Sequence, residues 1–462
     1  MVSRDDLEKQ IIGEAWTSPE VYGNVEQLCD FGSRFSGTKS ERQARDFIKG
    51  RFEAYGLENV RLVTFDYLSW KRGEVRVDVV EQGPVSLRSA LSLVYSPSTP
   101  AGGLRAEVVD VGMGTEAAFA AREDEIPGRF VMASSDSPQG QRRIHRREKY
   151  GRAVAQGAIG FLFVNHLPGM LAPTGSLRAG ELAEIPAVGL SYEDGFVIRR
   201  GLRDGKDVEL EMRISNETEP GTFSHVIGEV RGRVSDGARD KRVIVVGAHY
   251  DGHDISQGAT DDASGTALVM ELARIFAPLS GHLRRTLRFE TYAAEELGVL
   301  GSTRYVERMS DSAVAAVDFM LNLDGAALGS ERGVSLQGME ELSPLFHGFA
   351  RDMGYPLNLS TEVNTASDHF PYLMRGVPTG FLGARRKPGL GRGFGHTKAD
   401  TLDKVDEVEL RESAMVAARL LLRLANAEGE IGRRRTREEV KQLLLDHNLK
   451  EPLEAQGKWP FE

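Results

Sequence analysis

The 462-residue chain contains one cysteine, Cys29, and no long uninterrupted run of apolar residues. A single cysteine cannot form an intrachain disulfide or a cysteine-based zinc site, so any metal ion must be held by His, Asp and Glu side chains. No segment approaches the roughly 18 apolar residues that a membrane span requires. We therefore expect neither a disulfide-stabilised scaffold nor a protein of the membrane.

Basic residues are outnumbered by acidic ones. The chain has 58 Lys and Arg residues against 68 Asp and Glu residues, which gives a formal net charge of −10. Nucleic acid is therefore not expected as a partner, because proteins that bind it use a basic face to displace phosphate counterions. The first residues, MVSRDDLEKQ, lack the apolar core of a signal peptide, which predicts a cytoplasmic protein, or a secreted one if the sequence is a trimmed form.

The pattern of the first half predicts two kinds of structure. Thr38 and Glu41 have capping-box spacing, and apolar residues follow at helical intervals up to Gly56, so a helix and then a strand over 60–67 are expected. After Trp70 the chain turns to short alternating runs broken by Pro and Gly. This region predicts a β-rich domain with one helix near 150–156 and a strand at IGFLFV.

Strands and helices alternate from about residue 226 onward. The run VIVVGA (243–248) is typical of a buried parallel strand, and TLRFETYAA, VDFMLNLD and VPTGFLG predict three more. The pattern indicates an α/β fold with a doubly wound, mostly parallel sheet. The expected domains are 1–74 with 216–430, which together form the α/β domain, a β-rich insertion at 75–215, and a helical tail at 431–462.

Polar residues follow the expected strands, at the sheet edge where ligands of α/β proteins bind. The candidate metal ligands are His249, Asp261, Glu296, Asp324 and His396. Two imidazoles and three carboxylates suit two divalent ions of borderline hardness, with Zn²⁺ the first candidate and Co²⁺ or Mn²⁺ as alternatives. Two cations about 3.5 to 4 Å apart need a bridging carboxylate, and Asp261 is the candidate. His249 with Asp324 would complete one ion, and Glu296 with His396 the other, a partition that the sequence leaves open.

Two further acidic residues have expected roles beside the ligands. Asp251 lies two residues after His249, so in an extended chain both side chains point the same way, and Asp251 can accept the free ring N–H of that ligand. Glu295 and Glu296 are neighbours whose side chains diverge in extended backbone. One can then bind metal while the other, Glu295, acts as general base on the attacking water and passes the proton to the leaving amine.

Several motifs together resemble those of the M28 family of di-zinc aminopeptidases. They are HYD at 249–251, GATDDASG, the Glu295–Glu296 pair, NLD ending at Asp324, SDHFPY and HTKADTLDK, in the same order and spacing. The stretch GSRFSGTKSERQARDFIKGRFEAYGL is similar to the opening helix of that family, and 75–215 is similar to the protease-associated (PA) domain. The resemblance implies a zinc exopeptidase-like catalytic domain with two Zn²⁺ ions that hydrolyses the amino-terminal peptide bond of peptide substrates.

The sequence also departs from this family. Some members carry Tyr before the last ligand, where this chain has Gly395. The run DGHDISQGATDD is similar to the carboxypeptidase Q branch, whose members act on short peptides such as dipeptides. The alternatives are therefore a dipeptidase or carboxypeptidase of the same family, a receptor-like member without catalysis, and glutaminyl cyclisation, which the inserted domain disfavours. A homo-oligomer is left open.

Five residues are weaker candidates for substrate contact. Asp368 and His369 open an expected helix near the site, where a capping or core role is an equal alternative. His253 lies in the loop between two ligands, and an ordinary loop position is favoured. Arg385 and Arg386, with their basic neighbours, could hold a substrate carboxylate, although a solvated basic loop is favoured.

Overall fold

The computed structural model describes residues 4–80, 85–235, 238–239, 241–325, 329–385 and 393–462. The chain folds into two units. The first comprises Met1–Asp66, Thr222–Gly395 and Asp400–His447, and the second comprises Tyr67–Gly221, His396–Ala399 and Asn448–Glu462. The main segment of the second unit is thus slightly longer than the insertion expected at 75–215. The helical tail expected at 431–462 is divided between the two units after His447.

The first unit is built on an eight-stranded sheet with the order β1-β10-β14-β13-β15-β18-β16-β17. Its centre is parallel and consists of β14 (Thr286–Tyr292), β13 (Val243–His249), β15 (Val317–Asn322) and β18 (Thr379–Arg385). Toward the edges, β10 (Glu217–Val230) pairs antiparallel with β14, and β16 (Ser330–Ser335) pairs antiparallel with β18. The outer strands are β1 (Glu58–Lys71) and β17 (Asn358–Ser360).

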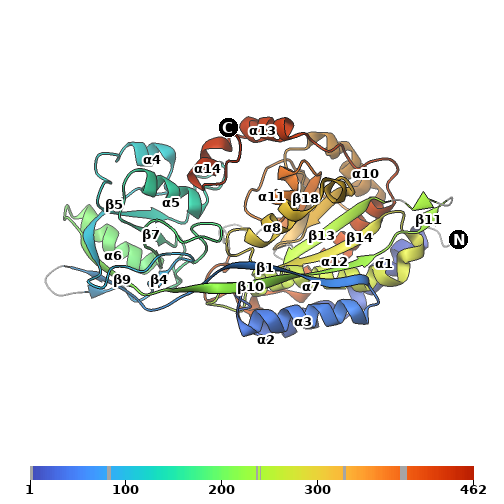
Figure 1. Cartoon of the computed structure of the whole chain (residues 1–462), viewed down its shortest axis with the longest axis horizontal. Coiled ribbons are helices and arrows are strands. Elements are labelled where there is room, and N and C mark those ends of the chain that lie inside the picture. The colour runs from blue at the N-terminus through green and yellow to red at the C-terminus, as the bar shows by residue number, and fades with distance from the viewer. Residues whose placement is uncertain (1–3, 81–84, 236–237, 240, 326–328, 386–392) are drawn as a thin grey trace. The chain divides into compact units, whose positions relative to one another are not determined.

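Helices cover both faces of this sheet (Figure 1). The chain moves from β13 through α7 (Ser264–Phe276) to β14, and then back past β13 through α8 (Leu300–Arg308) and α9 (Asp311–Ala315) to β15. Because parallel crossovers are right-handed, these opposite movements place α7 and α8 on opposite faces. Contacts agree, since α12 (Glu407–Asn426) packs on α7 and α11 (His369–Met374) packs on α8. The expected doubly wound α/β fold is confirmed, with antiparallel strands added at its edges.

Some elements of the first unit were not expected from the sequence. The helices α1 (Arg4–Thr17) and α2 (Glu20–Asp30) precede the predicted one, which is α3 (Lys39–Ala54), and β16 and β17 are also additional. Thr38 caps α3 by accepting a hydrogen bond from the N–H of Glu41 at 3.2 Å. The remaining helices are α10 (Ser343–Met353) and α13 (Arg437–Asp446).

The second unit has its own eight-stranded sheet, of order β3-β2-β9-β5-β6-β7-β8-β4. Four neighbouring strands are parallel: β5 (Leu104–Asp110), β6 (Phe130–Ser134), β7 (Gly160–Val164) and β8 (Ala187–Leu190). The others are β2 (Val75–Val79), β3 (Val85–Ser86), β4 (Leu91–Ser92) and β9 (Glu209–Ile214). The predicted helix is α5 (Arg146–Ala155), but α4 (Glu116–Ala120) and α6 (Tyr192–Arg203) are also present, so this unit has more helix than expected.

The end of the chain belongs to the second unit. Its last helix, α14 (Lys450–Ala455), packs on α5. Glu451 accepts two hydrogen bonds from Arg152, and a side chain at Gly151 would meet the carbonyl oxygen of Ala455 at 1.8 Å. The glycine therefore permits the close approach of the two helices.

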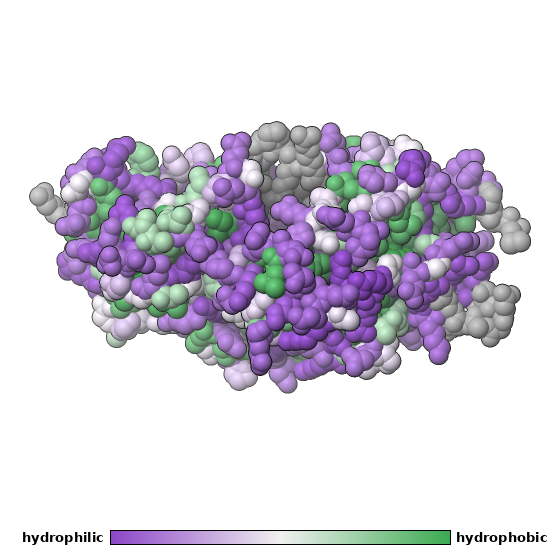
Figure 2. All heavy atoms as spheres, turned by 90° about the horizontal axis from the view of Figure 1, so that it is seen from above, coloured by the Kyte–Doolittle hydropathy of each residue, from purple (hydrophilic) through white to green (hydrophobic). Residues whose placement is uncertain are grey.

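The outer surface is largely polar. The face in Figure 2 carries mainly hydrophilic side chains, with apolar side chains scattered among them. Large exposed apolar residues include Trp16, Phe196 and Val408. Within the part of the chain that the structure describes, no helix combines the length and the apolar character needed to cross a membrane.

Candidate metal centre

The predicted site residues of the first unit gather where the direction of the chain reverses across the sheet. His249 is the last residue of β13, and Asp324 follows the end of β15 by two residues. These two strands are neighbours, and the chain leaves them in opposite directions along the sheet, toward β14 after β13 and toward β18 after β15. A crevice forms at such a switch point, beyond the carboxyl ends of the strands.

Carboxylates surround the ring of His249. Its Nε2 atom lies 3.3 Å from Asp261 Oδ1, 4.0 Å from Glu295 Oε2 and 4.0 Å from Asp324 Oδ1. Its Nδ1 lies 3.1 Å from the backbone oxygen of Asp251. Because a carbonyl can only accept, Nδ1 carries the proton and Nε2 presents its lone pair to the carboxylates. This is the arrangement of a metal-binding histidine.

Charge and burial at this ring both point to a cation. Burial lowers the pKa of His249, but the surrounding carboxylates of Asp251, Asp261 and Glu295 outweigh this effect, so the pKa lies well above its usual value. The buried Nε2 atom has no hydrogen-bond partner among the described residues. A divalent ion would neutralise the surrounding carboxylates and use this lone pair.

Asp262, next to Asp261 in the chain, also lies at this centre. Its Oδ1 accepts hydrogen bonds from the N–H groups of Gly265, at the start of α7, at 2.9 Å and of Gly325 at 3.0 Å. Donor atoms of His249, Asp262 and Asp324 lie within 4.8 Å of one another. Burial holds the pKa of Asp262 well above its usual value. Asp262 is therefore a further residue, with His249 and Asp324, whose side chain could hold a metal ion.

The Glu295–Glu296 segment is a turn, not the extended backbone that the sequence suggested. Ala294, just before it, has a φ of 61°. The two side chains nevertheless diverge, since Glu295 faces His249 while Oε2 of Glu296 lies 2.8 Å from His253 Nε2. Burial and then the charge of Glu296 raise the pKa of Glu295 well above its usual value, against the opposing effect of His249. A general base works best when its pKa lies near the operating pH, and the raised pKa brings Glu295 closer to that value than an exposed glutamate would be.

Side-chain acceptors fix four successive N–H groups of this turn. The N–H of Ala293 donates to His225 Nδ1 at 3.0 Å, and that of Ala294 donates to Ser36 Oγ at 2.9 Å. The next two N–H groups, those of Glu295 and Glu296, donate to Asp251 Oδ1 at 3.2 Å and Oδ2 at 3.3 Å. Ser36 also donates to Asp251 Oδ2 at 3.3 Å. Sequence analysis did not find Ser36 or His225, which lie on distant segments.

Asp251 thus does more than the sequence predicted. The carboxylate of Asp251 lies 3.5 Å from His249 Nδ1, but the backbone oxygen of Asp251 is the nearer acceptor for that nitrogen. The carboxylate mainly accepts hydrogen bonds from the N–H groups of the turn that contains Glu295 and Glu296, called the glutamate turn below. Asp251 therefore connects the histidine at the end of β13 with the segment that follows β14.

The loop between His249 and Asp261 is held by two further residues that sequence analysis missed. Arg34 is completely buried and donates to the backbone oxygens of Tyr250 at 2.8 Å and Gly258 at 2.9 Å. Asp400 accepts hydrogen bonds from the N–H of Thr260 at 2.8 Å and that of Asp261 at 3.2 Å. Burial raises the pKa of Asp400 to about 6. The HTKADT motif, which contains Asp400, was the available signal.

His396 belongs to the second unit. Its Nδ1 lies 3.1 Å from the backbone oxygen of Thr174, so this nitrogen carries the proton and Nε2 is the acceptor. That tautomer is the one a metal-binding histidine needs. Its pairing with Glu296 stays a prediction.

The weaker candidates are placed differently from one another. Asp368 is fully buried, and burial raises its pKa to about 7. His369 is also buried, with its Nε2 donating to the oxygen of Asn364 at 2.9 Å and its ring edge-on to Phe381, which indicates a packing role. Burial lowers its pKa to about 4. Arg386 and the side chain of Arg385 lie outside the described residues.

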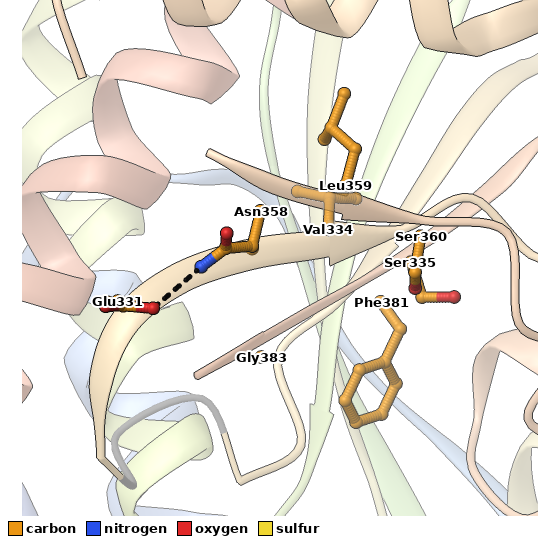
Figure 3. A pocket seen from close by; sticks show the side chains of 9 residues that line it. Glu331, Val334, Ser335, Asn358, Leu359, Ser360, Phe381 and Gly383 are labelled. Atoms are coloured by element: carbon orange, nitrogen blue, oxygen red, sulfur yellow. Dashed lines mark hydrogen bonds between the residues drawn. The ribbon is translucent and has the colours of Figure 1, made fainter. Parts of the chain in front are cut away.

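A groove of about 390 Å³ lies on the neighbouring strands β18, β16 and β17 (Figure 3). Glu331 accepts a hydrogen bond from Asn358 at 3.3 Å across it. Ser330 pairs with Arg385, so Glu331 lies near the carboxyl end of β18, the sheet edge that carries the metal-ligand candidates. The remaining lining residues are Gly333, Val334, Ser335, Leu359, Ser360, Phe381 and Gly383.

Comparison with known proteins adds independent information. Residues 226–421 match peptidase family M28, and residues 91–198 match the PA domain. Leucine aminopeptidase 2 of Trichophyton equinum is 28% identical over 403 residues, which cover 83% of this chain and 75% of that protein. Carboxypeptidase Q of Mus musculus is 24% identical over 432 residues, which cover 90% and 88%. The crystal structure of a peptidase M28 precursor from Shewanella amazonensis SB2B is similar, with a TM-score of 0.78, 25% identity and coverage of 94% of this chain and 100% of that chain.

Proposed function

We propose that this chain, whose residues 226–421 match peptidase family M28 and whose residues 91–198 match the PA domain, is an M28 aminopeptidase with two zinc ions, as its motifs predict. The chain is a metal-dependent exopeptidase, and peptides are its substrates. The observation that carries the proposal is the group of carboxylates around His249 Nε2, at the switch point of the sheet.

The residues present fit the metal ions. His249 Nε2 and Asp262 Oδ2 are buried polar atoms without hydrogen-bond partners among the described residues, and the donors are nitrogen and oxygen, which zinc accepts. We assign His249, Asp261 and Asp324 to one ion and Glu296 and His396 to the other, with Asp261 shared. When bound, the ions would polarise the scissile carbonyl group and lower the pKa of the attacking water.

The role of Glu295 follows from its position. Its carboxylate, 4.0 Å from His249 Nε2, takes a proton from the water that attacks the scissile carbon. It then gives this proton to the nitrogen of the leaving amine as the C–N bond breaks. One water is consumed, and the products are a free amino acid and the shortened peptide. Asp251 keeps the glutamate turn in place throughout.

The amino end of the substrate is the end that this site attracts. Carboxylates surround His249, and those whose charge the metal ions do not compensate would stabilise a free α-amine and repel a substrate carboxylate. The similarity to carboxypeptidase Q keeps a dipeptidase or carboxypeptidase as the second candidate. In that case the basic residues 385–392 would hold the far carboxylate, and Gly395 in place of Tyr is compatible with a different substrate position.

A set of matched peptides tests the proposal. We expect the zinc-loaded protein to hydrolyse Leu-Gly-Gly and its carboxyl-terminal amide at similar rates, and to leave N-acetyl-Leu-Gly-Gly intact. Hydrolysis that requires a free carboxylate would favour the second candidate. Absence of turnover on a broad peptide library, with metal bound, would favour the receptor-like alternative. A cytoplasmic location and a homo-oligomeric state stay predictions.

A further inference from the structure

A short segment of the second unit, residues 174–176, is hydrogen-bonded to His396 at two points. The N–H of Thr174 donates to the backbone oxygen of His396 at 2.8 Å, and Nδ1 of His396 donates to the backbone oxygen of Thr174 at 3.1 Å. Both residues are buried and belong to the same unit. His396 has a φ of 61°, which is uncommon for a residue other than glycine. Thr174 thus fixes the backbone and the ring of this histidine together.

Arg146, the first residue of α5, holds this segment in turn. Its Nη1 donates to the backbone oxygen of Thr174 at 3.0 Å, and its Nε and Nη2 donate to that of Ser176 at 3.1 Å and 3.0 Å. Arg146 is only 6% exposed. A side chain at Gly175 would meet Nη2 at 2.1 Å, so glycine is needed for the guanidinium group to approach this backbone. Because it is costly to bury a charged group without hydrogen bonds, the three contacts are what keeps Arg146 in this place.

Thr174 has further anchors. Nη2 of Arg72 donates to its hydroxyl group at 3.0 Å, and the N–H of Val94 donates to the backbone oxygen of Gly175 at 3.1 Å. The backbone oxygen that accepts the ring N–H of His396 therefore lies in a segment that is held at several points.

We infer that Arg146 is a positioning residue for the metal centre: it holds the backbone oxygen of Thr174, which keeps the proton on Nδ1 of His396 and leaves Nε2 for the cation. This inference rests on the proposed function, in which His396 is a ligand. A histidine whose other ring nitrogen donates to a fixed carbonyl oxygen binds metal more tightly, because its tautomer and ring orientation are set in advance. Arg146 and Thr174 lie in the stretch that matches the PA domain. The PA domain therefore contributes to metal binding itself.

The chain offers a matched control on the same helix. Arg152 of α5 donates to Glu451 at 2.8 Å and 2.6 Å and to the backbone oxygen of Gly114 at 3.0 Å. It thus makes three hydrogen bonds, as Arg146 does, but none with residues 174–176 among the described residues. Arg146→Met and Arg152→Met each remove one such guanidinium group and keep most of the apolar stem.

Metal binding by the full-length protein tests the inference without relying on activity. Metal-free protein is titrated with Co²⁺ and Zn²⁺ against a chelator while the visible Co²⁺ spectrum is recorded. His396→Ala identifies which of the two binding steps involves this ligand. Trp70 is buried in the second unit and donates to the backbone oxygen of Ser96 at 3.1 Å, so tryptophan emission and thermal unfolding of the metal-free variants verify that this unit folds.

We expect Arg146→Met to weaken the step that involves His396 by about 10- to 100-fold, the usual effect of losing a residue that orients a ligand. The other step should stay within about threefold of the wild type. Arg146→Lys should weaken the first step less, because an ammonium group can still donate to one of the two backbone oxygens. Arg152→Met should bind both ions as the wild type does. If Arg146→Met does not fold, Arg146→Lys is compared with Arg152→Lys, and only the former should weaken the step.

Two results would overturn the inference. If folded Arg146 variants bind both ions like the wild type, the guanidinium group has no role in metal binding. If the Arg146 and Arg152 variants weaken the step equally, the effect is a general loss of stability in the second unit and does not pass through Thr174. Two unchanged binding steps in His396→Ala would instead contradict the ligand set of the proposed function, so the failures are distinguishable.

Discussion

The carboxylate of Asp251 holds the backbone of Glu295, whose N–H donates to Oδ1 at 3.2 Å. Oδ2 of the same carboxylate receives the next N–H, that of Glu296, at 3.3 Å. Asp251 lies two residues beyond His249 in the chain. One carboxylate thus sets the spacing between the imidazole at the end of one strand and the general-base candidate that follows the neighbouring strand.

Asp251→Asn should therefore lower turnover more than it lowers metal binding. The amide has one acceptor oxygen for two N–H groups, and its NH₂ group would face one of them. We expect kcat to fall by about 10- to 100-fold, in line with other residues that orient a metal site. Steady-state kinetics on Leu-Gly-Gly and metal analysis measure the two effects. An unchanged kcat would contradict the role given to Asp251.

Glu295→Gln tests the general base directly. The amide is similar in size but cannot take a proton, so we expect kcat to fall by at least about 10²-fold, with both metal ions retained. The control is Glu307→Gln, at an exposed position of α8. Activity near that of the wild type would refute the assignment. Loss of metal would show that Glu295 is a ligand.

Removal of metal should abolish hydrolysis and reduce stability. Without cations, the carboxylates around His249 repel one another in a buried site, so chelation should lower the melting temperature as well as the rate. Readdition of Zn²⁺, Co²⁺ or Mn²⁺ to the dialysed protein, with activity and unfolding followed together, measures both effects. Full activity in excess chelator, with no metal found by elemental analysis, would contradict the metal-dependent mechanism.

Ser36→Ala tests the connection between the N-terminal segment and the glutamate turn. The buried hydroxyl accepts from the N–H of Ala294 and donates to Asp251, so its loss leaves a buried N–H unpaired at a cost of about 1 to 3 kcal/mol. We expect the free energy of unfolding to fall by that amount and kcat to fall as well. Ser312→Ala, on the exposed helix α9, is the control. If Ser36→Ala changes neither quantity, the hydroxyl does not support the turn.

The sequence predicted the central strands because continuous apolar runs form them, and it predicted the ligand candidates because they follow those strands. It missed α1 because the apolar residues of RDDLEKQIIGEAWT form no clear stripe. The side chains that accept hydrogen bonds from this turn could not be predicted for another reason. Ser36 and Ala294 are 258 positions apart, and no local sequence pattern indicates such a contact. The turn itself depends on a positive φ at an alanine, which composition does not indicate.

Glu41, which is not among the proposed metal ligands, predicts a pH dependence of stability. The side chain is buried and receives the hydroxyl of Tyr250, and burial raises its pKa from 4.5 to about 7. A carboxyl group whose pKa is raised by folding binds its proton more tightly in the folded state. Its contribution is therefore unfavourable once it ionises, and stability falls as pH rises from about 4.5 to 7.

Glu41→Gln removes this titration while keeping the shape of the side chain. Relative to the wild type, the variant should gain stability as pH rises through that window, by up to roughly 3 kcal/mol for a shift of this size. Urea unfolding at pH 4.5, 6 and 8 measures the difference, and Glu53→Gln on the exposed side of α3 is the control. A stability difference between Glu41→Gln and the wild type that stays constant over these pH values would show that Glu41 ionises in the folded protein as it does in the unfolded chain.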